Sequence, residues 1–548
     1  MKNRFKHNVL LSCIVLTASV ATWSACSDIL DETPDNRTEI DSVKKIKQLL
    51  TSAYPDKSAA LLCDLSGDSY VDNNVEVASA HNSSDYAWQD QAYAWEDVTN
   101  YTEGEDDTPF AVWDSYYKAI ATCNHALEAI DEMEKKANAD VDKLEHYRGE
   151  ALVQRAFLHF VLVNVFSLPY KDSISSLNDP GIPYVTKPET VVRVNYDRSS
   201  VTETYQAIEQ DLLAGLPLIS DVAYDVRAYH MNEAAANAFA ARFYLFKREW
   251  AKVLNYADVV LGGNPIDVLR KWRTMTGSTP EAKNLWFNDE AASTNLMIQC
   301  AYSTHCRMFS AARYGCNGLT QQVMGNGSGP CWSGRLPCFD GWLYTYEQKY
   351  GLFACRIVEQ FEYTDKIAGI GYVHTLYHPL STEETLLCRA EARLYLGDRD
   401  GCISDMNIWA KSKLCTQNLS LSSINRFYYA GRTGFVCDIN IDKMGWSAAD
   451  VATATTNKSV VDCLLHFRHI ENFYEGMRWF DIKRYGIPVT HEYKGSRDDF
   501  STTDVLDWND PRRALQVPTQ SINAGLVAND RTKTTVKGEN TAMIIPVK

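Results

Sequence analysis

The sequence lacks the patterns that mark most enzymes and metal-binding proteins. Its 15 cysteines form no C-x-x-C pair and no Cys/His cluster with zinc spacing. The motifs H-E-x-x-H and G-x-S-x-G and a phosphate-binding loop are also absent. We therefore predict a protein that is not an enzyme, with no catalytic residue, no metal and no cofactor.

Basic charge and long apolar runs are scarce as well. The 548 residues contain 54 Lys and Arg against 70 Asp and Glu, which gives a net charge of −16. This balance excludes nucleic acid, whose affinity comes from neutralised phosphates, and argues against electrostatic binding to anionic lipid. After residue 25 no purely apolar run reaches about 18 residues, so we expect any membrane attachment to come from acyl chains.

The first 26 residues have the order of a cleaved export signal. Basic residues in the first six positions precede a mostly apolar run at 9–20, which is too short to span a bilayer. The four residues that end at Cys26 resemble the bacterial lipobox, whose cysteine is acylated after cleavage. We expect 1–25 to be removed as a lipoprotein signal peptide and Cys26 to carry an acyl lipid such as palmitate. An ordinary secretory signal with a chance cysteine is the alternative.

Apolar residues recur with the helical period along most of the chain. Helices are expected at 40–50, from 109 to about 130, and at 144–166, 201–213, 232–246, 250–261, 383–396, 400–410 and 464–485. Short connections between successive helices predict antiparallel hairpins, and small residues in the alanine-rich pair fall near the tetratricopeptide spacing. Any single hairpin could instead be plain helix packing without repeat ancestry. Together the hairpins predict a mainly α fold, a tetratricopeptide-like helical hairpin scaffold with large irregular loop insertions.

We divide the mature chain into two regions, 26–261 and 262–548. The N-terminal helical region includes a polar, aromatic loop at 61–108 that we expect to contact ligand. The C-terminal region comprises a loop insertion at 262–380, a helical hairpin at 381–411, an irregular segment at 412–458, a long helix at 464–485 and a tail at 486–548. Long loops in compact domains are usually functional, and within the insertion we expect 316–350 to be the main working surface.

Several segments resemble the SusD/RagB outer-membrane lipoproteins of Bacteroidetes. The longest, Phe467–Gly486, has the sequence F-R-H-I-E-N-F-Y-E-G-M-R-W-F-D-I-K-R-Y-G. The segments Gly149–Pro169, Arg389–Asp398 and Cys26–Asp31 are similar to the family too. The resemblance implies a lipid-anchored protein on the cell exterior that caps a SusC-like TonB-dependent barrel transporter. Such proteins capture oligosaccharides, or peptides in some members, without catalysis.

The resemblance places the ligand site only by region, in loops from the N-terminal part and from about 270–345. Sugars have flat C–H faces and polar rims, so a site for them needs aromatic side chains beside hydrogen-bonding groups on a rigid support. The residues of these types that we predict to contact ligand are Asp68, Asn73, Asp85, Tyr86, Trp88, Trp95, Tyr314 and Trp332. The tryptophans could equally pack beneath their loops, and the asparagines could be turn residues.

Charged residues at 478–484 recur at three-residue spacing. Arg478, Asp481 and Arg484 are predicted to form a ladder along one helix face, extended by Glu471 and Glu475. Such ladders beside bulky apolar residues usually lock helices together. The alternative makes Glu475 and Asp481 a catalytic acid/base pair.

Two further alternatives belong to other classes of function. A surface glycoside hydrolase would use the acidic run Glu103, Glu105, Asp106 and Asp107, although a solvated run at a helix N-terminus explains it more simply. A third hypothesis is a scaffold that binds only proteins, through its helical groove.

Overall fold

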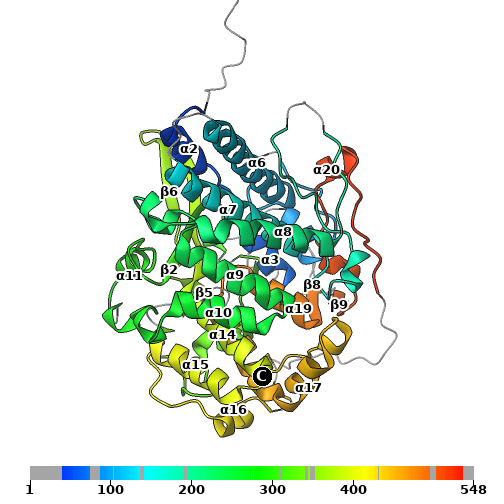
Figure 1. Cartoon of the computed structure of the whole chain (residues 1–548). Helices are drawn as coiled ribbons and strands as arrows, with labels where there is room; N and C mark the ends of the chain where they lie inside the picture. Colours follow the sequence, from blue (N-terminus) through cyan, green and yellow to red (C-terminus); the bar gives the residue numbers. More distant parts are fainter. Residues whose placement is uncertain are drawn as a thin grey trace, which may run out of the picture.

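Helical hairpins packed side by side form most of the protein (Figure 1). The computed structural model describes residues 40–73, 87–102, 104–135, 141–189, 194–275, 277–308, 312–339, 343–345, 352–429, 431–432, 434–493 and 502–534. The predicted signal peptide and Cys26 lie outside these residues, so acylation remains a prediction.

The N-terminal half is a row of long helices. Its members are α2 (Val43–Leu50), α6 (Pro109–Glu134), α7 (Val141–Phe166), α8 (Val201–Gly215), α9 (Glu233–Lys247) and α10 (Trp250–Leu261). Contacts link α2 to α6, α6 to α7, α7 to α8, and α9 to α10. The row continues through the hairpin of α14 (Thr382–Tyr395) and α15 (Arg399–Ser412), which packs on α10. These helices confirm the predicted mainly α scaffold.

Capping side chains set where these helices begin. The Thr108 hydroxyl accepts a hydrogen bond from the Ala111 amide at 3.2 Å, and Pro109 occupies the first turn of α6. Ser200 and Glu203 form a capping box at α8. Because caps act within a few residues, the sequence located these boundaries well.

Region 262–380 is not an irregular insertion, and this prediction was wrong. It contains a three-stranded antiparallel sheet in the order β2-β7-β6, built from β2 (Asn295–Tyr302), β7 (Ile370–Ser381) and β6 (Gln360–Asp365). Most of β2 is buried on both faces, so its apolar residues do not alternate and give no strand signal. The sheet packs against α9.

Short elements also occupy the segments 61–108 and 412–458, which were expected to be irregular. They are α3 (Ala60–Ser66), β1 (Val71–Asp72), α5 (Ala87–Tyr93), α16 (Leu421–Phe427) and α17 (Ala448–Thr456). Elsewhere lie α11 (Pro280–Phe287), β3 (Tyr314–Gly315), α12 (Gly318–Gln321), β4 (Leu343–Thr345), β5 (Leu352–Ala354), β8 (Val489–Tyr493), β9 (Thr502–Leu506) and α20 (Thr519–Asn523). Strands β1 and β3, β4 and β5, and β8 and β9 form antiparallel pairs.

The expected long helix at 464–485 is two helices, α18 (Lys458–Glu471) and α19 (Met477–Tyr485). Tyr474 and Gly476 between them adopt left-handed φ angles of 66° and 72°. A Cβ added at Gly476 would lie 2.9 Å from the Cα of Ala60, so α3 packs directly on the backbone of this break. The helical periodicity continues across the break, which explains why the sequence pattern did not show it.

The charges at 468–484 form a buried network in place of a ladder on one face. Asp481 pairs with Arg484 at 2.7 Å and with Arg468 at 2.9 Å, whereas Arg478 turns away to Asp68 at 2.6 Å. Glu391 of α14 accepts from Arg484 at 2.8 Å. The full network joins α9, α14, α18 and α19 through Arg242, Glu384, Glu391, Arg468, Asp481 and Arg484. It locks helices together, as predicted, but through neighbours that sequence spacing did not identify.

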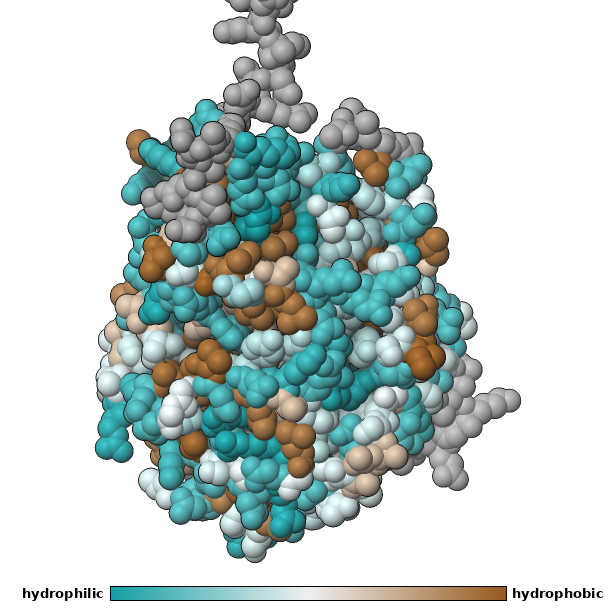
Figure 2. All heavy atoms as spheres, viewed as in Figure 1, coloured by the Kyte–Doolittle hydropathy of each residue, from teal (hydrophilic) through white to brown (hydrophobic). Residues whose placement is uncertain are grey.

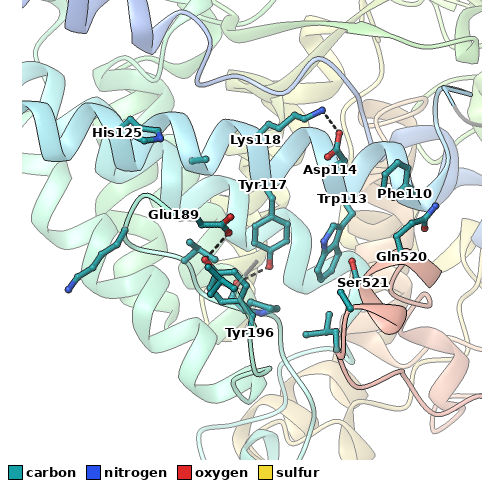
Figure 3. Close-up of a pocket in the computed structure, with 17 residues that line it drawn as sticks. Phe110, Trp113, Asp114, Tyr117, Lys118, His125, Glu189, Tyr196, Gln520 and Ser521 are labelled. Atoms are coloured by element: carbon teal, nitrogen blue, oxygen red, sulfur yellow. Dashed lines mark hydrogen bonds and ion pairs between the residues drawn. The ribbon is translucent and has the colours of Figure 1, made fainter. Parts of the chain in front are cut away.

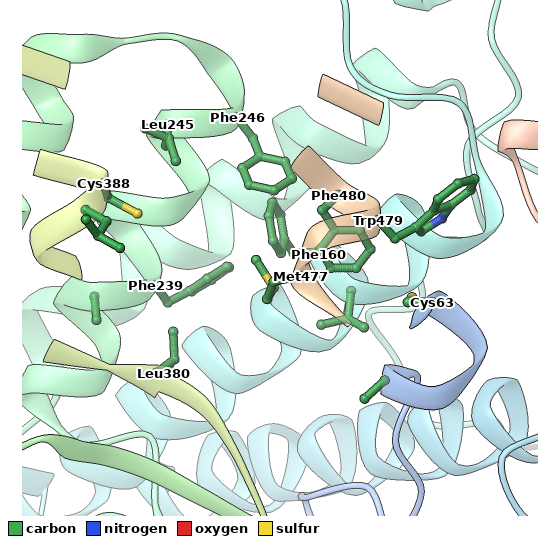
Figure 4. Packing of buried hydrophobic residues seen from close by; sticks show 14 of the residues in the cluster. Cys63, Phe160, Phe239, Leu245, Phe246, Leu380, Cys388, Met477, Trp479 and Phe480 are labelled. Carbon is green, nitrogen blue, oxygen red and sulfur yellow. The ribbon is translucent and has the colours of Figure 1, made fainter. Parts of the chain in front are cut away.

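One contiguous hydrophobic core runs between these helices. In Figure 4, Phe160 of α7, Phe239 and Phe246 of α9, and Phe480 of α19 pack together. In the part of the chain that the structure describes, one helical stretch, Leu144–Phe166, is long and apolar enough to cross a membrane, yet 94% of its most apolar window is buried inside the protein. It is a core helix.

The outer surface is mixed in character. On the face shown in Figure 2, hydrophobic residues form separate small groups between hydrophilic ones. Scattered groups of this kind are normal for protein surfaces and by themselves identify no binding site.

Candidate functional site

Four aromatic residues predicted to contact ligand are buried. The exposed fractions are 0% for Trp88, 1% for Trp95 and Tyr314, and 5% for Trp332. Trp95 stacks on His491 with ring centroids 4.1 Å apart and donates from Nε1 to the Ser66 carbonyl at 3.0 Å. In this structure none of the four offers a ring face to solvent, so their predicted role as stacking surfaces has to be corrected.

The other predicted residues contact neighbouring protein groups or lie outside the described residues. The backbone amide of Asn73 donates to the Arg313 carbonyl at 2.7 Å, whereas its buried side-chain Nδ2 has no hydrogen-bond partner among the described residues. The partly exposed Asp68 carboxylate is paired with Arg478, whose guanidinium lowers the pKa of Asp68 although burial acts in the opposite direction. Asp85 and Tyr86 lie outside the described residues, so nothing is decided about them.

The structure does bring part of this predicted region together. Arg313 pairs with Asp72 at 3.2 Å and with Asp90 at 2.9 Å, and the Tyr314 hydroxyl donates to Asp90 at 2.6 Å. The charged groups around β1 and β3 therefore pair with one another. The two strands form a rigid polar support.

A pocket with a volume of about 570 Å³ lies elsewhere, beside α6. We call it the α6 groove. Its wall residues come from α6, from the loop residues 183–189 and 194–196, and from the segment 520–526 around α20: Phe110, Trp113, Asp114, Tyr117, Lys118, Ala121, His125, Pro183, Val185, Lys187, Glu189, Val194, Tyr196, Gln520, Ser521, Ala524 and Leu526.

One row of α6 forms the floor of the α6 groove. Trp113, Tyr117, Ala121 and His125 follow each other at four-residue spacing, which places them on one helix face. The rings of Trp113 and Tyr117 lie 4.8 Å apart, and Trp113 is backed edge-on by Phe166 of α7 at 5.1 Å. Only 9% of Trp113 is exposed, so the half-buried Tyr117, which packs against it, provides most of the accessible ring surface of this row.

The opposite wall faces this row. Figure 3 shows Tyr117 projecting from α6 toward Tyr196 and Glu189, while Trp113 lies beside Ser521 of the α20 segment. The Tyr196 hydroxyl donates to Glu189 at 2.8 Å. Burial, followed by this hydrogen bond to a carboxylate, raises the pKa of Tyr196 to about 12, so the phenol stays protonated. Tyr117 donates to the Pro183 carbonyl at 2.8 Å, which ties the two walls together.

Buried side chains of α6 and α7 hold the loop in place. Arg155 binds Asp211 through two contacts of 2.7 Å and donates to Asn124 at 2.7 Å and to the Thr186 carbonyl at 3.2 Å. Asn124 donates in turn to the Val185 carbonyl at 3.0 Å. The groove wall is therefore fixed before any ligand arrives.

A neutral histidine completes this support. His159 accepts from the Val185 amide at 3.1 Å and stacks on Tyr184 at 3.9 Å. Burial lowers the pKa of His159 to about 3, so the ring is uncharged at neutral pH and its Nε2 acts as an acceptor.

The groove has polar groups along its rim. Lys118 pairs with Asp114 at 2.5 Å, and the Gln520 amide donates to the Tyr101 hydroxyl at 2.8 Å. Apolar ring faces edged by amide, carboxylate and ammonium groups suit a ligand with flat apolar faces and a hydroxylated edge.

The arrangement is suited to binding. Within the described residues, no group of three or more His, Cys, Asp or Glu side chains is placed to hold a metal ion. Of the acidic run suggested for a hydrolase, Asp106 pairs with Lys57 at 2.5 Å and Asp107 is fully buried against Thr304, while Glu103 lies outside the described residues. These carboxylates do not open onto a common cleft.

Sequence reasoning missed the groove for two reasons. Its loop and C-terminal walls carry no motif, and α20 lies about 400 residues from α6 along the chain. A signal was nevertheless present, since Tyr117, Ala121 and His125 share a helix row beside the buried residues Trp113, Tyr116 and Ile120.

Solved structures from Bacteroides share this fold. A Bacteroides vulgatus protein named for sugar binding gives a TM-score of 0.62 at 18% identity, covering 90% of this chain and 99% of that chain. SusD superfamily proteins from Bacteroides vulgatus and Bacteroides thetaiotaomicron give TM-scores of 0.58 and 0.57 at 18% and 12% identity; each covers 90% of this chain, and 98% and 99% of their own. Fold and groove together define a helical, SusD-like protein with a ligand-sized pocket.

A family model also matches the N-terminal part of the sequence. Residues 28–245 match a SusD-like family model described as starch-binding and associating with the outer membrane. No curated protein matches the chain. This match and the shared fold support the resemblance to the SusD/RagB family found in the sequence. These findings support a carbohydrate-binding protein associated with the outer membrane.

Proposed function

We propose that this protein captures oligosaccharides at the cell surface in the α6 groove and delivers them, unaltered, to a SusC-like TonB-dependent barrel. An acyl group on Cys26 would hold it at the outer membrane. The observation that carries the proposal is Tyr117, packed on Trp113, facing Tyr196 across the groove, in a chain whose residues 28–245 match a starch-binding family model.

The groove has the chemistry that sugar capture needs. Stacking of a sugar's C–H face on an aromatic ring removes apolar surface from water, and the polar rim can replace hydrogen bonds that the hydroxyl groups lose. A volume of about 570 Å³ lies within the usual range for ligand pockets. Prior fixing of the loop by Arg155 and Asn124 limits the entropy lost on binding.

The position of the groove supports delivery toward the membrane. In Figure 1, α6 and α20 lie at the same end of the molecule as α2, the first described helix after the predicted acylation site. A tether that starts at Cys26 would keep this end near the bilayer, and a ligand held there would be close to a barrel in that membrane.

Binding to a panel of oligosaccharides and peptides tests the capture step. The chain with Cys26→Ala is titrated calorimetrically, then the same chain with Tyr196→Ala or Tyr196→Phe. We expect an oligosaccharide to bind and Tyr196→Ala to raise its Kd about tenfold, equivalent to about 1.4 kcal/mol. Tyr196→Phe keeps the ring and should stay within about threefold.

The exposed Tyr429 is the matched control, and Tyr429→Ala should bind like the unchanged chain. If no oligosaccharide binds, or if Tyr196→Ala has no effect, glycan capture in this groove is wrong. Binding of peptides alone would move the protein to the peptide-importing branch that the resemblance also allows.

Anchoring and partner are tested in cells. We expect Cys26→Ala to move the protein out of the outer-membrane fraction, and mass spectrometry to find acyl groups on the unchanged chain. Co-purification of the acylated protein with a TonB-dependent barrel is expected. An unmodified amino terminus would refute the anchor.

A further inference from the structure

We infer that the hairpin of β6 and β7 inserts its tip into a lipid surface and so provides a second membrane contact besides the predicted acyl group. The hairpin turn spans residues 365–370. This inference goes beyond glycan capture and does not depend on it.

The tip exposes large apolar side chains that nothing in the described structure covers. The exposed fractions are 101% for Ile367, 61% for Ile370, 52% for Tyr363 and 56% for Tyr372. Isolated exposed residues need no explanation, but four on one projecting hairpin form a patch that favours contact with another phase or molecule.

The turn itself is well formed. The Asp365 carboxylate accepts from the backbone amides of Ile367 and Ala368 at 2.9 and 3.0 Å. Its charge is thus occupied within the turn, and Gly369 provides the left-handed φ of 68° that closes it. The hydrogen-bonded turn therefore holds the Ile367 side chain exposed to solvent.

Apolar and aromatic side chains lie together at the end of the hairpin. Ile367 and Ile370 are at the tip beside Asp365 and the exposed Lys366, and Tyr363 and Tyr372 come next. In a bilayer, tyrosine favours the interface and a lysine beside apolar residues can extend its ammonium group to the headgroups. Because the predicted acyl anchor would hold this end of the molecule at a membrane, we commit to lipid.

The hairpin is also on the part of the molecule that the tether reaches. The segment after α2 contacts the sheet: the Tyr302 amide donates to the Asp56 carbonyl at 2.8 Å, and Lys57 lies 4.5 Å from the Tyr302 ring centre. Tyr302 in turn packs edge-on against Tyr372 at 5.6 Å. Figure 1 shows β6 beside α2, the first described helix of the chain.

The length of the tether allows this contact. Residues 27–42 connect Cys26 to α2, and a fully extended chain of that length spans at most about 50–60 Å. An acylated Cys26 would therefore keep the hairpin close to the membrane surface and raise its effective concentration there.

Insertion of apolar side chains into lipid should not weaken as the salt concentration rises. The chain has a net charge of −16, so electrostatic attraction to anionic lipid does not contribute. Binding through the tip should be equal on neutral vesicles at low salt and at about 1 M salt, where the Debye length is about 3 Å.

The test uses the full chain without its acyl group, Cys26→Ala, and neutral phosphatidylcholine vesicles. Co-sedimentation gives the lipid partition coefficient, and hydrogen exchange of residues 360–372 is measured with and without vesicles. We expect salt-insensitive binding with slowed exchange in the hairpin. The double variant Ile367→Ser and Ile370→Ser should lower the partition coefficient at least tenfold.

The matched control is Val222→Ser with Val259→Ser, which removes two comparably exposed apolar side chains outside the hairpin. It should bind like the parent. The inference is overturned if the parent does not bind vesicles, or if both double variants bind equally. It is also overturned if the hairpin variant only loses co-purification with a barrel, because the tip would then contact protein.

Discussion

At the scale of single residues, the buried acid Asp107 is the clearest case of a group out of its usual state. Oδ2 of Asp107 accepts from the Thr304 amide at 2.9 Å, and none of the described cations pairs with it. Burial raises its pKa to about 7, although hydrogen bonds from Ser303 and Thr304 oppose the shift. Its φ of 64° lies in the left-handed region, which Asn tolerates as well as Asp.

Replacing this acid by its neutral amide should make the protein less sensitive to rising pH. Because the folded-state pKa of Asp107 is raised, its contribution to stability is fully present below about pH 4 and is lost as pH rises through 7. Asp107→Asn should therefore match the parent near pH 4 and exceed it by about 4 kcal/mol at pH 8, since the shift is about three pKa units and each unit is worth about 1.4 kcal/mol. Urea unfolding across this range measures the difference.

The surface Asp225, paired with Lys47 at 2.7 Å, serves as the control. Its hydrogen bond to Lys47 lowers the pKa of Asp225, so Asp225→Asn should change stability by an amount that does not vary between pH 5 and 8. A pH-independent effect of Asp107→Asn would show that Asp107 is ionised in the folded state throughout.

At the scale of elements, the break between α18 and α19 depends on one glycine. Gly476 has a left-handed φ of 72°, and α3 packs so closely that an added Cβ would lie 2.9 Å from both the Ala60 Cα and the Cys63 Cβ. Because of the break, α19 runs in a different direction from α18. This direction places Asp481 beside Arg468 and Arg484 beside Glu391.

Gly476→Ala should destabilise the protein by about 2–4 kcal/mol, combining left-handed strain of about 1–2 kcal/mol with overpacking of about 1–3 kcal/mol. The control is Gly397→Ala, in the turn between α14 and α15. Gly397 has a φ of 88°, and no atom lies within 4 Å of the added Cβ. It should show the strain alone, so equal losses in urea midpoints for the two variants would argue against close packing at the break.

At the scale of the whole molecule, the buried ion network joins helices that are far apart in the sequence. Arg242 comes from α9 and Glu391 from α14, while Arg468 and Asp481 come from α18 and α19. Burial alone would raise the pKa of Asp481, but Arg468 and Arg484 outweigh it and lower the pKa to about 2. The carboxylate is thus ionised at neutral pH, and both arginines need it.

This network should make the protein sensitive to acid and to loss of one charge. A lowered carboxyl pKa contributes stability above about pH 4 that is lost as pH falls through 2. Asp481→Asn should cost about 3–5 kcal/mol at pH 7, because removing one partner leaves a buried charge uncompensated. It should also flatten the loss of stability between pH 4 and pH 2.

Chemical unfolding at several pH values tests this, with Glu132→Gln as the control. Glu132 pairs with Lys135 at the surface, where both side chains are about two-thirds exposed. Glu132→Gln should therefore lower the free energy of unfolding by less than about 1 kcal/mol. If the two substitutions cost the same at pH 7, the network does not stabilise the fold.

Local information explains what was predictable. The hairpin helices follow from apolar periodicity, and starts such as Thr108 and Asn232 follow from caps that act within one turn. The strands of 262–380 were missed because β2 is buried on both faces and does not alternate. Trp88 and Trp95 were expected at the surface because a tryptophan in a polar segment looks the same whether it packs inward or outward.

The sequence by itself determined the helical scaffold, the positions of most helix ends and the resemblance to a family, because each depends on residues within a turn or on a contiguous motif. Only the tertiary structure decided which aromatic rings reach solvent, where the 464–485 helix breaks, and that α6, residues 183–189 and 194–196, and α20 enclose one groove. Those outcomes depend on contacts between segments hundreds of residues apart. Their energies arise from packing and burial, which no local pattern encodes.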